Sequence, residues 1–169
     1  MELLLDRWLH VLAGITWIGL LYYFNFVQVP AMAKAKADGT AAGITKHVAP
    51  KALLWFRWAA LVTWLTGAIY LIRASQLDFV DAFLLGFGSH PNPQNAVIGM
   101  GAWLGTIMLF NVWVLIWPNQ KKVLGMVEAS DADKAKAARV ALLASRTNTM
   151  LSIPMIYFMV ASAHWAIGG

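Results

Sequence analysis

Two histidines, His10 and His164, lie inside long apolar segments of the sequence, where an ionisable side chain is costly. Imidazole nitrogen is a common ligand of haem iron, and two facing helices can each present one imidazole to the same iron. Alternatively, both rings hydrogen-bond to lipid headgroups or to the neighbouring backbone. The residues alone leave both interpretations open, with His10 and His164 as the candidate metal ligands.

Four further residues are candidates for holding a cofactor. Gly14 and Trp17 follow His10 by four and seven positions, so a helix places all three on one face. The glycine leaves a groove there, in which a flat macrocycle can approach the backbone. His47 precedes the second apolar segment and Arg57 lies inside it. Arg57 is suited to pairing with a haem propionate or another anion, or to reaching the lipid headgroups.

The other chemistry-bearing residues narrow the choice of function. The sequence has no cysteine, which excludes disulfides, thiolate metal sites and covalently attached haem, so any haem b is held non-covalently. No Ser/His/Asp set, phosphate loop or pair of intramembrane carboxylates is present, which argues against a hydrolase, an ATPase or a carboxylate-driven proton pump. Asn111 and Asn148 are typical of hydrogen bonds between helices, and Gly101 and Gly105 have the spacing of a close helix contact.

The elements that must position these residues are predicted to be membrane-spanning helices. Hydrophobic residues make up 60% of the 169 and charged residues 12%, against roughly 45–50% and about 25% in soluble domains. The apolar residues fall into four segments, each near the roughly 20 residues that cross a bilayer as a helix. We therefore expect an all-α, integral membrane four-helix bundle, a single domain over 1–169, with spans at about 3–29, 51–72, 96–117 and 149–167.

Charge distribution orients this bundle. The first and third predicted loops hold ten of the thirteen Lys and Arg residues, whereas the opposite side has only Arg7 and Arg73. The positive-inside rule therefore places the two basic loops in the cytoplasm, both termini outside, and His10 and His164 in the outer leaflet. We expect a multi-pass protein of the cell inner membrane, whose net charge of +5 contacts lipid headgroups and not nucleic acid.

Three stretches of the sequence resemble the membrane-embedded N-terminal domain of bacterial urate hydroxylases that are fused to a cytochrome c, the urate oxidase N-terminal family. They are HVLAGITWIGLLYYFNFVQVP, WFRWAALVTWLTG, and GTIMLFNVWVLIWPNQKKV with SRTNTMLSIPMIYFMVASAHW. The resemblance implies a haem-linked redox protein in which His10 and His164 match family histidines. The family's enzymes have about eight spans and a C-terminal cytochrome c, and they carry histidine where Leu54 and Thr147 stand here. The sequence therefore resembles a short, four-helix form.

Three functions follow as hypotheses. The first is a membrane b-type haem protein that transfers electrons or serves as a redox subunit, with a cytochrome c or a respiratory-type membrane complex as partner. The second is a non-catalytic accessory or assembly subunit, indicated by the glycine spacing and by the lack of a recognisable substrate pocket. The third, a haem-dependent oxidoreductase acting on urate, another small heterocycle or protoporphyrinogen, rests on family analogy alone. Whether the chain is an enzyme, and whether two copies associate, stays open.

Overall fold

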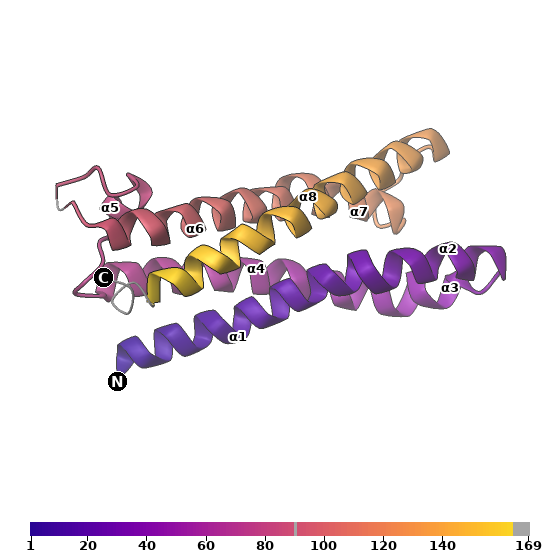
Figure 1. Ribbon diagram of the computed structural model, residues 1–169. Helices are drawn as coiled ribbons and strands as arrows, with labels where there is room; N and C mark the ends of the chain where they lie inside the picture. Colours follow the sequence, from indigo (N-terminus) through magenta and orange to yellow (C-terminus); the bar gives the residue numbers. More distant parts are fainter. Residues whose placement is uncertain (90, 164–169) are drawn as a thin grey trace.

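The computed structural model describes residues 1–89 and 91–163, and these residues form helices and connecting turns without a strand (Figure 1). Four long helices lie side by side along the molecule. The long helices are α1 (Glu2–Tyr22), α4 (Ala49–Arg73), α6 (Pro93–Phe110) and α8 (Asp131–Ala163). Short helices connect them: α2 (Val29–Ala37), α3 (Ala41–Gly43), α5 (Phe79–Phe83) and α7 (Trp117–Val123).

Three π-helical turns each lie just before a proline. They are η1 (Tyr23–Gln28), η2 (Ile44–Val48) and η3 (Asn111–Ile116), and each ends two residues before a proline, at Pro30, Pro50 and Pro118. A proline lacks the N–H that would bond to the carbonyl four residues earlier, and a wider turn redistributes the bonds just before it. The chain is therefore helical through Pro30 and Pro118, where the sequence predicted helix ends.

The long helices are arranged as two hairpins with a common sequence pattern. Helix α1 packs mainly on α4, and α6 packs mainly on α8. Trp-x-Gly-x-x-x-x-Phe-Asn occurs at 17–25 in the first hairpin and again at 103–111 in the second, and a π-helical turn and a proline accompany it both times. The two hairpins thus use the same local device to continue from a long helix into a short surface helix.

Three helical segments are long and apolar enough to cross a membrane: Glu2–Ala37, Ala41–Arg73 and Pro93–Val123. They contain the first three predicted spans. The fourth predicted span, at about 149–167, extends beyond the residues that the structure describes. The described part of α8 begins with a charged stretch that includes Asp131, Lys134 and Arg139.

Buried amides join the second hairpin. Asn111 Nδ2 donates to Asn148 Oδ1 over 2.8 Å, and Asn148 Nδ2 donates to the Met108 carbonyl over 3.0 Å. Asn148 is fully buried, so its amide is satisfied by protein groups and not by lipid headgroups. This contact confirms the prediction that Asn111 and Asn148 link helices.

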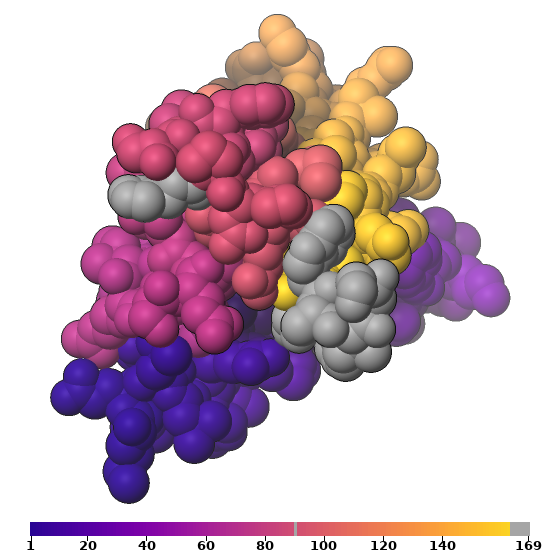
Figure 2. Space-filling view, turned by 60° about the vertical axis from the view of Figure 1, so that its left-hand side comes forward, coloured from indigo at the N-terminus to yellow at the C-terminus, as the bar shows by residue number. Residues whose placement is uncertain are grey.

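One end of the bundle collects four helix ends. Arg73 Nη1 at the end of α4 lies 2.9 Å from Asp6 Oδ2 at the start of α1, and Gln94 Nε2 at the start of α6 donates to the Ser162 carbonyl near the end of α8 over 2.9 Å. Figure 1 shows α5 at this end too, with α2, α3 and α7 at the opposite end. We call the end of the bundle that contains α5 the α5 end. Figure 2 shows the molecule with this end turned toward the viewer.

Candidate functional site

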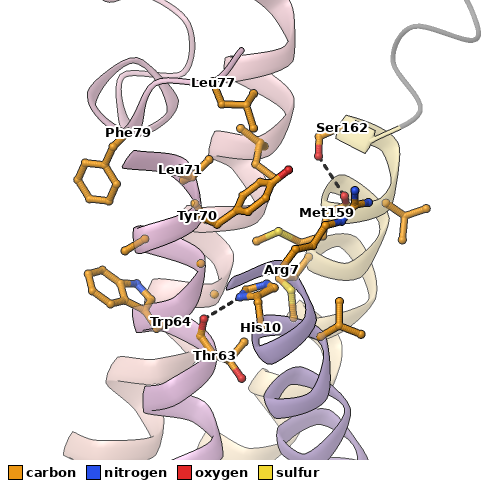
Figure 3. A pocket seen from close by; sticks show the side chains of 18 of the residues that line it. Arg7, His10, Thr63, Trp64, Tyr70, Leu71, Leu77, Phe79, Met159 and Ser162 are labelled. Atoms are coloured by element: carbon orange, nitrogen blue, oxygen red, sulfur yellow. Dashed lines mark hydrogen bonds between the residues drawn. The ribbon is translucent and has the colours of Figure 1, made fainter. Parts of the chain in front are cut away.

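His10 is fixed to α4 by its own ring. Its Nδ1 lies 2.8 Å from the carbonyl oxygen of Thr63, a bond drawn dashed in Figure 3. Because a carbonyl oxygen only accepts hydrogen bonds, Nδ1 carries the hydrogen, and in the neutral ring Nε2 keeps its lone pair. This ring thus has a defined tautomer, with one nitrogen available to a ligand or a metal.

The His10 ring packs unusually close to the backbone of helix α4. A Cβ atom built on Gly67 would lie 2.8 Å from His10 Cε1 and 2.9 Å from His10 Nδ1, which is closer than real Cβ contacts. Only a glycine at this position lets the imidazole approach the α4 backbone. The Thr63 carbonyl, one turn earlier, accepts from His10 Nδ1 and from Thr66 Oγ1 as well.

A cavity of about 450 Å³ opens beside His10 at the α5 end. All four long helices contribute to its wall, together with α5 and the turn before it. Its volume is within the range of about 300–1,000 Å³ that is common for small-molecule sites. The aromatic side chains in the wall are Trp17, Trp64, Tyr70, Phe79 and Phe83.

Besides His10, the cavity wall carries two thioethers, one cation and two indoles. Met155 and Met159 line it from α8, and Arg7 lines it from α1. Trp17 is 2% exposed, and its Nε1 is buried without a hydrogen-bond partner. A buried donor without a partner is costly, and the Trp17 N–H leaves one hydrogen bond unmade behind the cavity wall.

The predicted site residues are brought together only in part. His10 and Trp17 line the cavity. Gly14 does not line it but faces α4, since a Cβ there would meet Thr63 Cγ2 at 3.8 Å. The expected groove beside Gly14 is therefore occupied by α4.

Arg57 and His47 lie away from the cavity. The Arg57 guanidinium carbon stacks over the Trp117 ring, 3.7 Å from its centroid, and His47 is exposed on η2. Along the axis from Thr63, Arg57 is about 9 Å and His47 about 24 Å away, from the helical rise per residue. His164 lies outside the described residues, and over 1–89 and 91–163 no group of three or more His, Cys, Asp or Glu residues is placed to hold a metal ion.

Several contributors to the site were not predicted from the sequence, among them Gly67, Thr63 and the methionine pair. Gly67 is the sole glycine between Ala49 and Arg73, which is a signal for a close approach inside an apolar helix. Thr63 contributes its backbone carbonyl, and because every residue has one, the sequence does not indicate this role. Met155 and Met159 are four positions apart, a spacing that core packing also produces.

Comparison with protein families gives one result that covers the chain. The sequence profile of the urate oxidase N-terminal family matches residues 1–86 and 74–168. Comparison with curated proteins found no match, and comparison with solved structures found none either. Because the two family matches together extend over nearly the whole sequence, the chain belongs to the urate oxidase N-terminal family.

Proposed function

We propose that this protein is a membrane b-type haem protein in which His10 would bind the haem iron. The observation that carries the proposal is the His10 ring, whose Nδ1 donates to the Thr63 carbonyl while the ring lines the cavity. Metal-binding histidines commonly donate one ring N–H to a backbone carbonyl, which orients the ring and leaves the other nitrogen for the metal. Gly67 supports this role by admitting the ring against α4.

The cavity suits a flat, largely apolar macrocycle. Aromatic rings from α1, α4 and α5 line it, and apolar side chains such as Ile98 on α6 and Met155 on α8 complete the wall. His164 is our proposed second ligand, because the predicted topology places it in the same leaflet as His10. Bound haem would supply a one-electron redox couple. The protein's part is to hold the ring of His10 in one tautomer and to keep water from the site with apolar walls.

In the bilayer, we propose four spans with the α5 end outside. The three apolar helical segments and the concentration of lysines around α2, η2, α7 and the start of α8 support this orientation. The cavity then lies in the outer half of an inner-membrane, multi-pass protein. Electron transfer to a cytochrome c or within a respiratory-type membrane complex is the role that we propose for a site at this level.

Optical spectroscopy tests the proposal directly. Protein expressed with ample haem supply and purified in mild detergent is expected to show a Soret band and reduced α and β bands. His10→Ala should lose most of the haem, and added imidazole should restore part of the spectrum by replacing the missing ligand. His47→Ala is the matched control, because His47 is exposed on η2, and it should keep its haem.

Two results would contradict this function. Wild-type protein that stays colourless with ample haem would point instead to an accessory or assembly subunit, in particular if it co-purifies with a partner chain. Equal haem content in His10→Ala and wild-type protein would remove His10 as a ligand. Urate and protoporphyrinogen turnover by the purified protein would separately test the oxidase hypothesis.

A further inference from the structure

Arg7 brings a positive charge to the wall of an otherwise apolar cavity. It precedes His10 by three positions on α1, so one helix face carries both side chains. Both line the cavity, and Figure 3 shows Arg7 beside His10, reaching toward the last turns of α8 near Met159. Both side chains therefore face the same cavity.

The charge of Arg7 is available to a ligand because the nearby acidic groups have another partner. Arg73 Nη1 lies 2.9 Å from Asp6 Oδ2 and 3.9 Å from Glu2 Oε2, so the other arginine at the α5 end neutralises the acidic start of α1. Over the described residues Arg7 forms no ion pair. Asp78, the first carboxylate after Arg73 in the chain, accepts from the Asp81 backbone N–H and caps α5.

Tyr70 adds a neutral donor to the same wall. Its ring lines the cavity from α4, and Figure 3 shows its hydroxyl pointing into the space between α4 and the end of α8. A guanidinium and a phenol at one rim, above aromatic walls, match a molecule with an anionic edge and an apolar body.

We propose that Arg7, assisted by Tyr70, binds a carboxylate of the cavity's ligand. This inference rests on the proposed function, in which that carboxylate is a haem propionate. It assigns the anion-binding role to Arg7 instead of Arg57, because the Arg57 guanidinium stacks on Trp117 away from the cavity. Arg7 is a binding and positioning residue, and His10 remains the ligand of the iron.

The test compares haem with haem dimethyl ester, in which both carboxylates are blocked. Each is titrated into haem-depleted full-length protein in neutral detergent, and binding is followed at the Soret band. For haem, Arg7→Gln should weaken binding about tenfold to a hundredfold, the size expected for a charged hydrogen bond. For the dimethyl ester, wild type and Arg7→Gln should bind alike, and Arg7→Lys should recover part of the haem affinity.

Arg73→Gln is the matched control. It removes the same charge at the same end of the bundle, but from a residue that pairs with Asp6 and does not line the cavity. Its haem affinity should stay close to wild type. Equal weakening by Arg7→Gln and Arg73→Gln would mean a general effect of charge, and would overturn the proposal.

The remaining outcomes separate this inference from the proposed function. If wild-type protein binds haem through His10 and Arg7→Gln binds it equally well, Arg7 contacts lipid headgroups and the inference is wrong while the function stands. If Arg7→Gln weakens the dimethyl ester as much as haem, the arginine does not recognise the carboxylate. If wild-type protein binds neither compound, the proposed function itself fails, and Arg7 has no haem carboxylate to bind.

Discussion

Gly67→Ala should displace the His10 ring and weaken the site built on it. The new Cβ would lie 2.8 Å from His10 Cε1, whereas ordinary van der Waals contact begins at 3.4 Å. The ring would have to move by about 0.6 Å or more, which exceeds the roughly 0.5 Å range of N–H···O distances. The 2.8 Å bond from His10 Nδ1 to the Thr63 carbonyl cannot keep its geometry after such a shift.

The expected magnitude combines three contributions. Overpacking a filled site costs about 1–3 kcal/mol, and the lost hydrogen bond costs about 0.5–1.5 kcal/mol. Alanine in place of glycine inside a helix returns roughly 1 kcal/mol. We therefore expect Gly67→Ala to lower the free energy of unfolding by about 0.5–3.5 kcal/mol. If the same strain opposes the ligand-bound geometry, haem affinity falls about tenfold to a hundredfold.

Thermal unfolding in detergent and Soret titration measure the two effects. Gly19→Ala is the matched control, since its Cβ would meet no atom within 4 Å, and it should be as stable as wild type or more so. Wild-type stability and wild-type haem affinity in Gly67→Ala would refute the reasoning, because they would mean that the His10 ring does not rest on Gly67. Reduced stability in both glycine variants would point to a general effect of helix substitution.

Three further predictions concern helix packing. Gly99→Ala should detach α5 from α6, because its Cβ would lie 2.8 Å from the backbone carbonyl carbon of Ala82; faster proteolysis between the two helices would reveal this, and an unchanged digest would contradict it. Asn148→Ala should cost about 1–3 kcal/mol in unfolding by leaving the buried Asn111 amide without its partner, and the double variant with Asn111→Ala should cost less than the sum of the single ones. Trp117→Leu should cost about 0.5–1 kcal/mol in thermal unfolding by removing the ring under Arg57, with the haem content unchanged because both residues lie away from the cavity.

Hydrophobicity and residue spacing were sufficient to predict much of the helical architecture. The first three predicted spans lie within helical segments that are apolar and long enough to cross a membrane, because hydrocarbon requires every backbone group to be bonded within its own helix. The helix ends were less predictable. Proline usually ends a helix, but the π-helical turns before Pro30 and Pro118 let the chain continue.

The candidate site, like the fold, was predicted from the sequence only in part. The sequence identified His10 and Trp17, since a histidine in an apolar segment is rare and residues seven apart share a helix face. It also suggested Gly14 and Arg57, but Gly14 faces the Thr63 side chain of α4 and Arg57 stacks on Trp117. The packing of the helices decides which residues of a helix face reach the cavity.

Tertiary structure alone selected the partners of His10. The Thr63 carbonyl, the bare backbone at Gly67 and the guanidinium of Arg7 come to one cavity only after α1 has packed on α4 in one register. Residue types do not show which backbone carbonyl will accept a hydrogen bond. Whether a glycine matters for packing depends on which side chain lies against it. The sequence therefore determined that a titratable ring, His10, lies within the apolar helices. The packing of those helices decided the tautomer of the ring, its contact with the backbone at Gly67 and the cavity beside it.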